Sequence, residues 1–180
     1  MKFDYMYFEN IFTVNECLEI NNICKNNLND MYDLPAKGVK KSSNINFIFW
    51  KNIKNKIDII KNYIKISNEN FKFDIFDIKE DNYLAYNTYS DKNKGEYGWH
   101  SDLNKENNNH FKLTVLLNIS IENYVGGFFE LFLNKPLHIK QFDKTGCMLI
   151  FPTYLQHRVT PVIQGERNTL ALWLEGPRFK

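Results

Sequence analysis

The feature that most constrains the fold is a change in hydrophobic pattern near residue 70. After this point the chain divides into short runs rich in β-branched and aromatic residues, separated by Gly, Pro, Asn and Asp. In residues 113–120 the pattern is clearest, because Leu113, Val115, Leu117 and Ile119 alternate with the residues between them. A period of two is typical of a strand whose faces meet different surroundings. We therefore expect strands at 71–78, 82–89, 112–120, 128–133, 137–142, 147–151, 157–163 and 168–175.

The chain before residue 70 has helical periodicity instead. A capping box formed by Thr13 and Glu16 predicts a helix that continues to about Leu28. A second helix is predicted by apolar residues three or four positions apart, which form one stripe along a helical surface. This stripe consists of Trp50, Ile53, Ile57, Ile60 and Ile64.

These patterns together predict the fold class. A length of 180 residues suits one domain, and 43% hydrophobic residues provide for a substantial core. We expect a single domain over 1–180 that is mainly β with N-terminal helices. Its helical lead-in, 1–70, is expected to pack on a jelly-roll double sheet formed by 71–176.

Residues 37–65 contain eight Lys and one Asp, which is compatible with a nucleic-acid-binding patch. The segment has no Arg that could bind phosphate through two parallel hydrogen bonds. The net charge of the whole chain is only +2. We therefore favour the solvated face of a helix and do not expect a nucleic-acid partner.

The sequence also carries information on the cellular setting. No apolar run approaches the roughly 20 residues of a membrane span, and the N-terminus lacks the apolar core of a signal peptide. The three cysteines, Cys17, Cys24 and Cys147, are odd in number and have no Cys-x-x-Cys spacing. Neither a disulfide framework nor a cysteine-zinc site is indicated. We expect a reducing, cytoplasmic protein without a membrane partner.

His100 and Asp102 are the first candidates for a metal site. On an extended strand, residues i and i+2 project from the same face, so this imidazole and carboxylate can point at one ion. An isolated His-x-Asp pair is more often a surface feature or a local hydrogen-bonded pair. The assignment therefore depends on a further ligand.

His157, at the start of a predicted strand, can supply that ligand. Standing alone, it would be interpreted as a half-buried strand histidine bonded to a backbone carbonyl. Two His and one carboxylate, however, occupy one face of an octahedron and leave three positions open. Non-haem Fe(II) oxygenases use this arrangement, because a bidentate 2-oxo acid and O2 bind at the open face.

Arg167 is the fourth candidate. It follows His157 by ten residues, lies beyond a turn indicated by Pro161 and Gly165, and begins the last predicted strand. A planar guanidinium binds a carboxylate in a bidentate manner that Lys does not reproduce. An exposed turn arginine is the alternative, but apolar residues as far as Trp173 follow it closely.

Ordered motifs fill much of the chain between roughly residues 83 and 176. They are YGWHSD at 97–102, GGFFEL at 126–131, LIFP at 149–152, HRVTPV at 157–162, and GER at 165–167 followed by Trp173. Together they resemble the prolyl 4-hydroxylase-like and PKHD-type branch of the 2-oxoglutarate- and Fe(II)-dependent dioxygenases. The combination is specific, whereas any single motif is not.

This resemblance implies a double-stranded β-helix core with iron at one end, held by His100, Asp102 and His157. It also implies that Arg167 binds the distal carboxylate of the cosubstrate 2-oxoglutarate. The implied activity is hydroxylation of an unactivated C–H bond with Fe(II), 2-oxoglutarate and O2.

Two further residues are expected near the cosubstrate by the same resemblance. Tyr89 stands at about the place of an aromatic residue that often contacts it. Asn118 stands where some relatives have a Tyr that supports the distal carboxylate.

Two other functions are compatible with the residues alone. A zinc hydrolase would use the same three ligands with water as the fourth, and would have no use for Arg167. A non-enzymatic jelly-roll binding module would retain a vestigial metal site. For an oxygenase, a peptide or small-molecule substrate is expected, with peptidyl proline favoured. Free amino acids, other peptide residues, small metabolites or a nucleobase are the alternatives.

The residues that flank the ligand pair are candidates for the substrate entrance. Trp99 and the polar loop 103–111 are expected to form part of it. Burial of Trp99 in the core is the alternative, because large aromatic residues are mostly buried.

Overall fold

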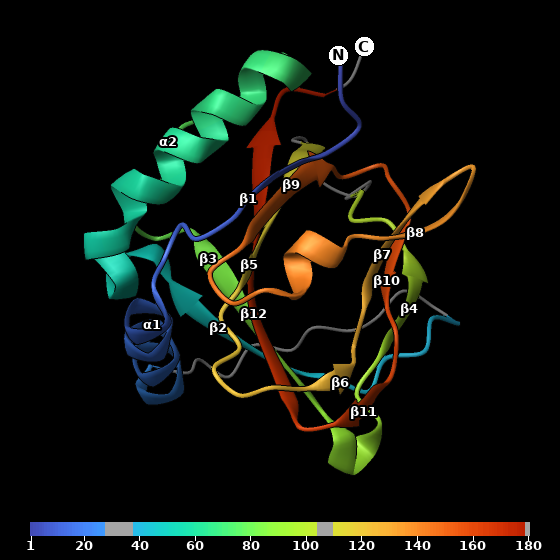
Figure 1. The fold of residues 1–180 in the computed structure, drawn as a ribbon. Helices are drawn as coiled ribbons and strands as arrows, with labels where there is room; N and C mark the ends of the chain where they lie inside the picture. Colours follow the sequence, from blue (N-terminus) through green and yellow to red (C-terminus); the bar gives the residue numbers. More distant parts are fainter. Residues whose placement is uncertain (28–37, 104–109, 179–180) are drawn as a thin grey trace.

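The computed structural model describes residues 1–27, 38–103 and 110–178. These residues form three layers, which Figure 1 shows as two helices, a large sheet in the middle and a smaller sheet on the far side. Within the described ranges, no helix has the length and apolar character that a membrane span requires.

The central layer is a six-stranded sheet in which all neighbouring strands are antiparallel. Its longest strand, β12, pairs with β3 on one side and β5 on the other. In spatial order the strands are β1 (Met6–Phe8), β9 (Met148–Pro152), β5 (His110–Asn118), β12 (Glu166–Gly176), β3 (Tyr83–Ser90) and β2 (Asn44–Phe49).

The smaller sheet faces the inner side of the large one and has four strands. In spatial order they are β4 (Tyr97–His100), β10 (His157–Val159), β7 (Phe129–Leu133) and β8 (Lys135–His138). A separate pair joins β11 (Val162–Gln164) to β6 (Val125–Gly126). Short 3-10 helices lie at Trp50–Ile53 (η1), Asp91–Asn93 (η2) and Lys140–Asp143 (η3).

Helix α1 (Val14–Asn26) begins at the predicted capping box. Thr13 Oγ1 accepts a hydrogen bond from the Glu16 amide at 3.3 Å, and Glu16 Oε2 accepts one from the Thr13 amide at 2.9 Å. The box is therefore confirmed. The predicted end at Leu28 lies outside the described residues.

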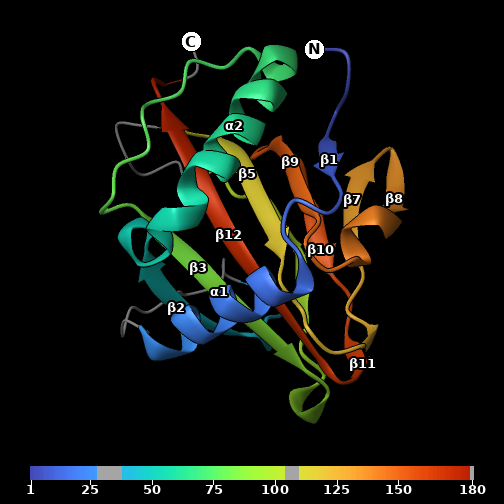
Figure 2. The same cartoon turned by 60° about the vertical axis from the view of Figure 1, so that its left-hand side comes forward.

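Helix α2 (Lys54–Phe71) lies with α1 against the outer face of the large sheet (Figure 2). The predicted stripe is buried, but Trp50 and Ile53 belong to the 3-10 turn that precedes the helix. Lys56 is also buried and pairs with two carboxylates of α1, at 3.1 and 3.2 Å. One residue of the Lys-rich segment thus joins the two helices instead of facing solvent.

Strand alternation divides the core into two parts. On β5, Leu113, Val115 and Leu117 pack toward the helices, whereas Leu116 packs toward the smaller sheet. Residues of both sheets, including Phe129, form the second, inner cluster. This inner layer is where the cavity described below lies.

Three predictions about secondary structure were wrong. The stretch 71–78 contains no strand, because Phe71 completes α2 and the Asn68 side chain caps the helix end by bonding the Phe73 backbone in both directions. Strand 137–142 is replaced by the end of β8 and by η3. The lead-in 1–70 is not purely helical, since β1 and β2 form both edges of the large sheet.

Candidate active site

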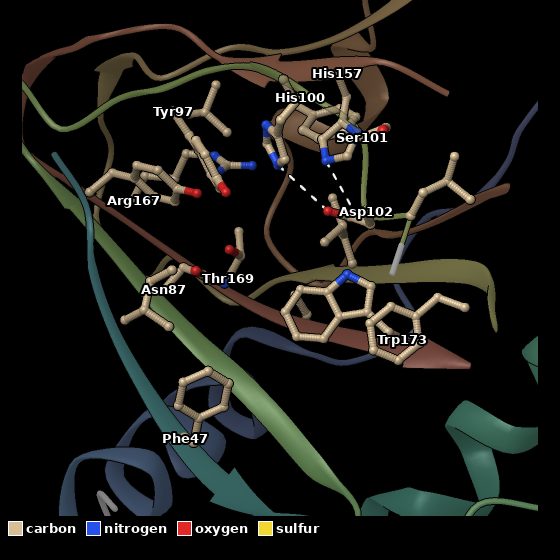
Figure 3. A pocket seen from close by; sticks show the side chains of 18 residues that line it. Phe47, Asn87, Tyr97, His100, Ser101, Asp102, His157, Arg167, Thr169 and Trp173 are labelled. Atoms are coloured by element: carbon tan, nitrogen blue, oxygen red, sulfur yellow. Dashed lines mark ion pairs between the residues drawn. The ribbon is translucent and has the colours of Figure 1, made fainter. Parts of the chain in front are cut away.

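A cavity of about 450 Å³ opens between the two sheets. Its walls are supplied by strands distant in sequence, as Figure 3 shows for the side chains that line it. The lining residues include His100, Asp102, His157, Arg167 and Tyr89. Five of the six residues predicted for the site therefore face one cavity.

The three predicted metal ligands come together on one wall. His100 and His157 are register partners across β4 and β10. His100 Nε2 lies 3.6 Å from Asp102 Oδ1, and His157 Nε2 lies 3.5 Å from Asp102 Oδ2. Such separations suit one ion bonded at about 2.0–2.2 Å to each ligand atom. The three residues could therefore hold a single metal ion.

An irregularity in β4 decides which of its side chains reach this wall. The register pairs His157 with His100 and Val159 with Tyr97, so β4 has one more residue than β10 in this interval. An extra residue of this kind is a β-bulge and re-aims the side chains around it. Tyr97 and His100 consequently face the cavity together, and their rings stack at 3.6 Å.

Trp99, which directly precedes His100, faces the opposite side by ordinary strand alternation. Its ring lies 4.7 Å from the Arg158 guanidinium and 5.6 Å from the Phe132 ring, and it does not line the cavity. The expectation that Trp99 forms part of the entrance is not supported by this placement. Of the loop 103–111, residues 104–109 lie outside the described residues, while Leu103 and Phe111 line the cavity.

Hydrogen bonds to the far side of each imidazole orient the candidate ligand atoms. His100 Nδ1 lies 2.8 Å from the Gly98 carbonyl oxygen, and His157 Nδ1 lies 3.0 Å from the Leu155 carbonyl oxygen. A proton on each Nδ1 satisfies these carbonyls and leaves the Nε2 lone pair free for a metal. Burial, followed by the neighbouring His157, lowers the pKa of His100 to about 4, against the opposing effect of Asp102. His100 is therefore neutral near pH 7, as a metal ligand must be.

Asp102 is held by a residue that the sequence interpretation missed. Thr114 of β5 donates a hydrogen bond of 2.6 Å to Asp102 Oδ2, and the Asp102 amide donates to the Thr153 carbonyl at 3.0 Å. In the sequence Thr114 is one of the residues that alternate with Leu113 and Val115, and this pattern assigned it no role. Only the packing of β5 beside the His-x-Asp segment gives it this role.

Arg167 lies at another end of the cavity. It is 2% exposed, and its Nε has no hydrogen-bond partner among the described residues. Its Cζ atom lies 5.3 Å from the Tyr89 ring and 5.4 Å from the Phe142 ring. A buried guanidinium between two aromatic rings is costly unless an anion joins it. The carboxylate of a ligand in the cavity would supply such an anion.

Gly127 leaves the space that Arg167 occupies. This glycine has a φ of +61°, and a Cβ added to it would lie 3.2 Å from Arg167 Cδ and 2.8 Å from Val162 Cγ2. The Gly-Gly motif at 126–127 therefore forms a turn and also leaves room for the side chain of Arg167.

Tyr89 and Asn118 have different placements. Tyr89 is the register partner of Arg167 on β3 and lines the cavity beside it. Asn118 is fully buried, with its amide nitrogen bonded to the Phe142 carbonyl at 2.8 Å and its oxygen accepting from the Ser120 amide at 3.0 Å. Asn118 does not line the cavity, and Leu116 of the same strand does. The structure thus gives Asn118 a role in packing beneath the site.

Further polar side chains face the cavity without having been predicted. Asn87 and Thr169 are cross-strand neighbours and lie near Arg167 in Figure 3, and Trp173 lies on the other side, below Asp102. Trp173 appeared only as part of a motif in the sequence interpretation. Asn87 and Thr169 carried no sequence signal, because their position depends on the pairing of β3 with β12.

The site therefore combines two imidazoles and a carboxylate on one wall with a buried guanidinium at a distance from them, whose Nε has no hydrogen-bond partner among the described residues. The donor set is that of a 2-His-1-carboxylate iron site, and the arginine fits a diacid whose far end is anionic. A sequence model of the 2OG-Fe(II) oxygenase superfamily matches residues 84–175. This match covers just over half of the 180 residues, and the chain belongs to this superfamily. Its metal is accordingly Fe(II), its cosubstrate is 2-oxoglutarate and its oxidant is O2.

Solved structures show the same fold in more detail. A Pseudomonas putida prolyl-4-hydroxylase has a TM-score of 0.73 at 16% identity, covering 99% of this chain and 95% of that one. The viral collagen prolyl hydroxylase of Paramecium Bursaria Chlorella virus-1, in its 2OG complex, has a TM-score of 0.72 at 16% identity, covering 97% of both chains. A Trichoplax adhaerens prolyl hydroxylase bound to a hypoxia inducible factor peptide has a TM-score of 0.70 at 18% identity, covering 95% of this chain and 83% of that one.

These matches confirm the predicted fold class, with a jelly-roll core preceded by helices. They also confirm the prolyl 4-hydroxylase-like character of the fold. None of the curated proteins compared with this chain matches it in sequence.

Proposed function

We propose that this dioxygenase hydroxylates an unactivated C–H bond of a peptide substrate, with peptidyl proline as the favoured target. The observation that carries the proposal is the combination, in a single cavity, of the His100, Asp102 and His157 wall with the buried Arg167, whose Nε has no partner in the part of the chain that the structure describes. In this proposal the three residues hold the iron and Arg167 holds the distal carboxylate of 2-oxoglutarate.

The assignment of the ligands rests on how their protons are placed. His100 and His157 direct Nδ1 to backbone carbonyls and Nε2 toward Asp102. Thr114 donates a hydrogen bond to one oxygen of the Asp102 carboxylate, which keeps this group oriented. When bound, the iron with 2-oxoglutarate and O2 supplies the oxidation that inserts one oxygen atom into C–H and yields succinate and CO2.

The protein's own residues contribute binding, orientation and exclusion of water. Arg167 fixes one end of the cosubstrate, and Tyr89 and Phe142 shield its guanidinium from solvent. The apolar cavity residues Phe47 and Phe111 surround the space that is left for the substrate. A dry cavity strengthens the charge-assisted bond between Arg167 and the carboxylate.

The peptide class is supported by the relatives rather than by a feature of the cavity alone. The Trichoplax adhaerens structure holds a peptide, and the other two structures are of prolyl hydroxylases. The open space beside the iron ligands is lined by aromatic and aliphatic side chains, which suit the ring of a proline.

The test is succinate formation from 2-oxoglutarate with Fe(II) and O2, measured with pools of proline-containing peptides, other peptides, free amino acids and nucleic acids. We expect succinate to rise most with proline-containing peptides and the peptide mass to rise by one oxygen atom. A response confined to free amino acids or nucleic acids would contradict the substrate class. A zinc hydrolase or an inactive binding module would give no succinate in any pool.

A further inference from the structure

A pair of ionisable side chains lies close to Arg167 without facing the cavity. His138 Nε2 lies 2.7 Å from Asp143 Oδ2, and the two side chains are 24% and 30% exposed. Neither residue lines the cavity, and neither belongs to the group that could hold a metal ion. Binding of iron therefore does not explain this pair.

Two segments join the pair to Arg167. Asp143 ends η3, the short orange helix in Figure 1, and this helix places an aromatic ring 5.4 Å from Arg167 Cζ. On the other side, the ring centroids of His138 and Phe128 lie 4.4 Å apart. Phe128 follows Gly127, whose missing side chain leaves room for Arg167. The Arg167 side chain thus lies between two segments that meet at the bond between His138 and Asp143.

The position of η3 is fixed by its packing. Phe142 is fully buried, and its ring centroid lies 5.6 Å from that of Phe129 in the inner core cluster. The Tyr124 hydroxyl group donates a hydrogen bond of 3.3 Å to the Asp143 carbonyl oxygen. These contacts hold the backbone of Asp143 in place, so its carboxylate is kept near Arg167.

Asp143 acts on Arg167 through space and not by direct contact. Both residues lie in the described part of the chain, and no ion pair joins them. Burial raises the pKa of Asp143, whereas His138, followed by Arg167, lowers it. The neighbouring Lys144 pairs with Glu9 at 2.6 Å instead. Among the described residues, His138 and Arg167 are therefore the basic groups that act on the Asp143 carboxylate.

A carboxylate near Arg167 opposes the binding of a second anion at the guanidinium. Partial burial makes this opposition stronger than it would be in water, because less solvent screens the charges. The hydrogen bond from His138 ties the Asp143 carboxylate to β8 and offsets part of its charge. The net charge that a ligand meets at Arg167 therefore depends on both residues.

We propose that Asp143 is a counter-charge that limits the affinity of Arg167 for the distal carboxylate of 2-oxoglutarate, and that His138 weakens this effect by binding Asp143. The proposal rests on the role proposed for Arg167 and adds two residues that tune it. A limited affinity has a use in turnover, because succinate keeps the distal carboxylate of 2-oxoglutarate and must leave the site before the next cycle.

The test measures the dissociation constant of 2-oxoglutarate by calorimetry in the Fe(II)-loaded, oxygen-free protein. Asp143→Asn removes the charge and keeps an oxygen that accepts from His138, so we expect 2-oxoglutarate to bind about two- to fivefold more tightly. His138→Phe keeps a ring against Phe128 and removes the donor, so binding should weaken by a similar factor. The opposite signs are decisive, since damage to the packing around Arg167 would weaken binding in both variants.

Glu9→Gln is the matched control for the loss of a charge. The Glu9 carboxylate pairs with Lys144, next to Asp143 in the chain, and does not line the cavity, so this variant should bind 2-oxoglutarate like the wild type. A control ligand is 2-oxopentanoate, which has the chain length of 2-oxoglutarate and a methyl group in place of the distal carboxylate. Asp143→Asn should leave its affinity unchanged, because this ligand offers Arg167 no anion.

Unchanged or weaker 2-oxoglutarate binding by Asp143→Asn would overturn the proposal, as would equal gains for 2-oxoglutarate and 2-oxopentanoate. Thermal unfolding shows whether each variant is folded. If Asp143→Asn is not, an unchanged or tighter affinity in His138→Phe overturns the proposal by itself. Wild-type affinity in Arg167→Ala would refute the role proposed for Arg167, whereas a strong loss there with no change in Asp143→Asn would refute only the counter-charge.

Discussion

The hydroxyl group of Thr114 donates a hydrogen bond of 2.6 Å to Asp102 Oδ2, so a residue of the large sheet orients the carboxylate of the proposed iron site. Both partners are shielded from solvent, and the remaining oxygen of Asp102 faces His100. This contact joins strand β5 of the large sheet to the segment that directly follows strand β4 of the smaller sheet. The geometry of the site therefore depends on how the two sheets pack.

Thr114→Val should weaken iron binding while preserving the fold, because valine keeps the shape of threonine and loses the hydroxyl group. Loss of a partner that orients a metal ligand typically lowers metal affinity about 10- to 100-fold. Anaerobic titration with Fe(II) measures this change. Thr88→Val is the matched control, since Thr88 donates to Asn168 on β12 and not to Asp102. Equal iron affinities in the two variants would contradict the role of Thr114.

Arg167→Ala should leave Fe(II) binding intact and weaken 2-oxoglutarate binding by roughly thirtyfold or more. Removing one partner of a buried, charge-assisted pair costs about 2–5 kcal/mol, and each 1.4 kcal/mol corresponds to about tenfold in affinity. Arg167→Lys should be intermediate, because the charge remains and the two-pronged geometry is lost.

The measurement for Arg167 is titration of 2-oxoglutarate into the iron-loaded, oxygen-free protein, followed by the visible charge-transfer band. Arg158→Ala is the control, because Arg158 pairs with Glu130 at 2.6 Å on the opposite face of the smaller sheet. An unchanged affinity of Arg167→Ala for 2-oxoglutarate would show that the distal carboxylate binds elsewhere in the cavity.

Asn118→Ala should affect stability rather than the cosubstrate. The Asn118 amide bonds the Phe142 carbonyl and the Ser120 amide in a fully buried position, so the variant leaves two backbone groups unpaired. We expect the free energy of unfolding to fall by about 1–3 kcal/mol, as measured by denaturant titration. The dissociation constant of 2-oxoglutarate should change little. A large loss of 2-oxoglutarate affinity at unchanged stability would show that Asn118 does contribute to binding the cosubstrate.

Glu16 should make the stability of α1 depend on pH. The backbone hydrogen bond from Thr13, followed by the bond from Lys56, holds the pKa of Glu16 below its usual value of 4.5. A lowered carboxyl pKa stabilises the folded state fully above the unfolded value, and this contribution is lost as the pH falls through the lowered pKa. Between about pH 6 and about pH 3, Glu16→Gln should therefore lose less stability than the wild type. Parallel denaturation curves over this range test the difference, and an identical pH dependence in both proteins would contradict it.

The sequence by itself determined those features that depend on local periodicity and on chemistry carried within a few residues. The capping box of Thr13 and Glu16, the apolar stripe of α2 and the alternation on β5 are of this kind, and each was found where it was expected. The order of the motifs was also sufficient to predict that His100, Asp102, His157 and Arg167 share one site, and all four line one cavity. Few kinds of site use two histidines, a carboxylate and an arginine in this order along the chain, so the sequence was enough to identify these residues.

Tertiary structure decided the features that depend on strand register and on irregular backbone. One extra residue on β4 places Tyr97 on the same face as His100, which no pattern of period two can predict. Pairing of β5 with β12 sets Trp173 against Thr114, and pairing of β3 with β12 sets Asn87 against Thr169. Asn118 does not line the cavity, because its amide group bonds a buried backbone carbonyl of the neighbouring 3-10 turn η3. Hydrogen bonds and contacts between residues far apart in sequence fix these positions, so their partners become known only when the sheets are assembled.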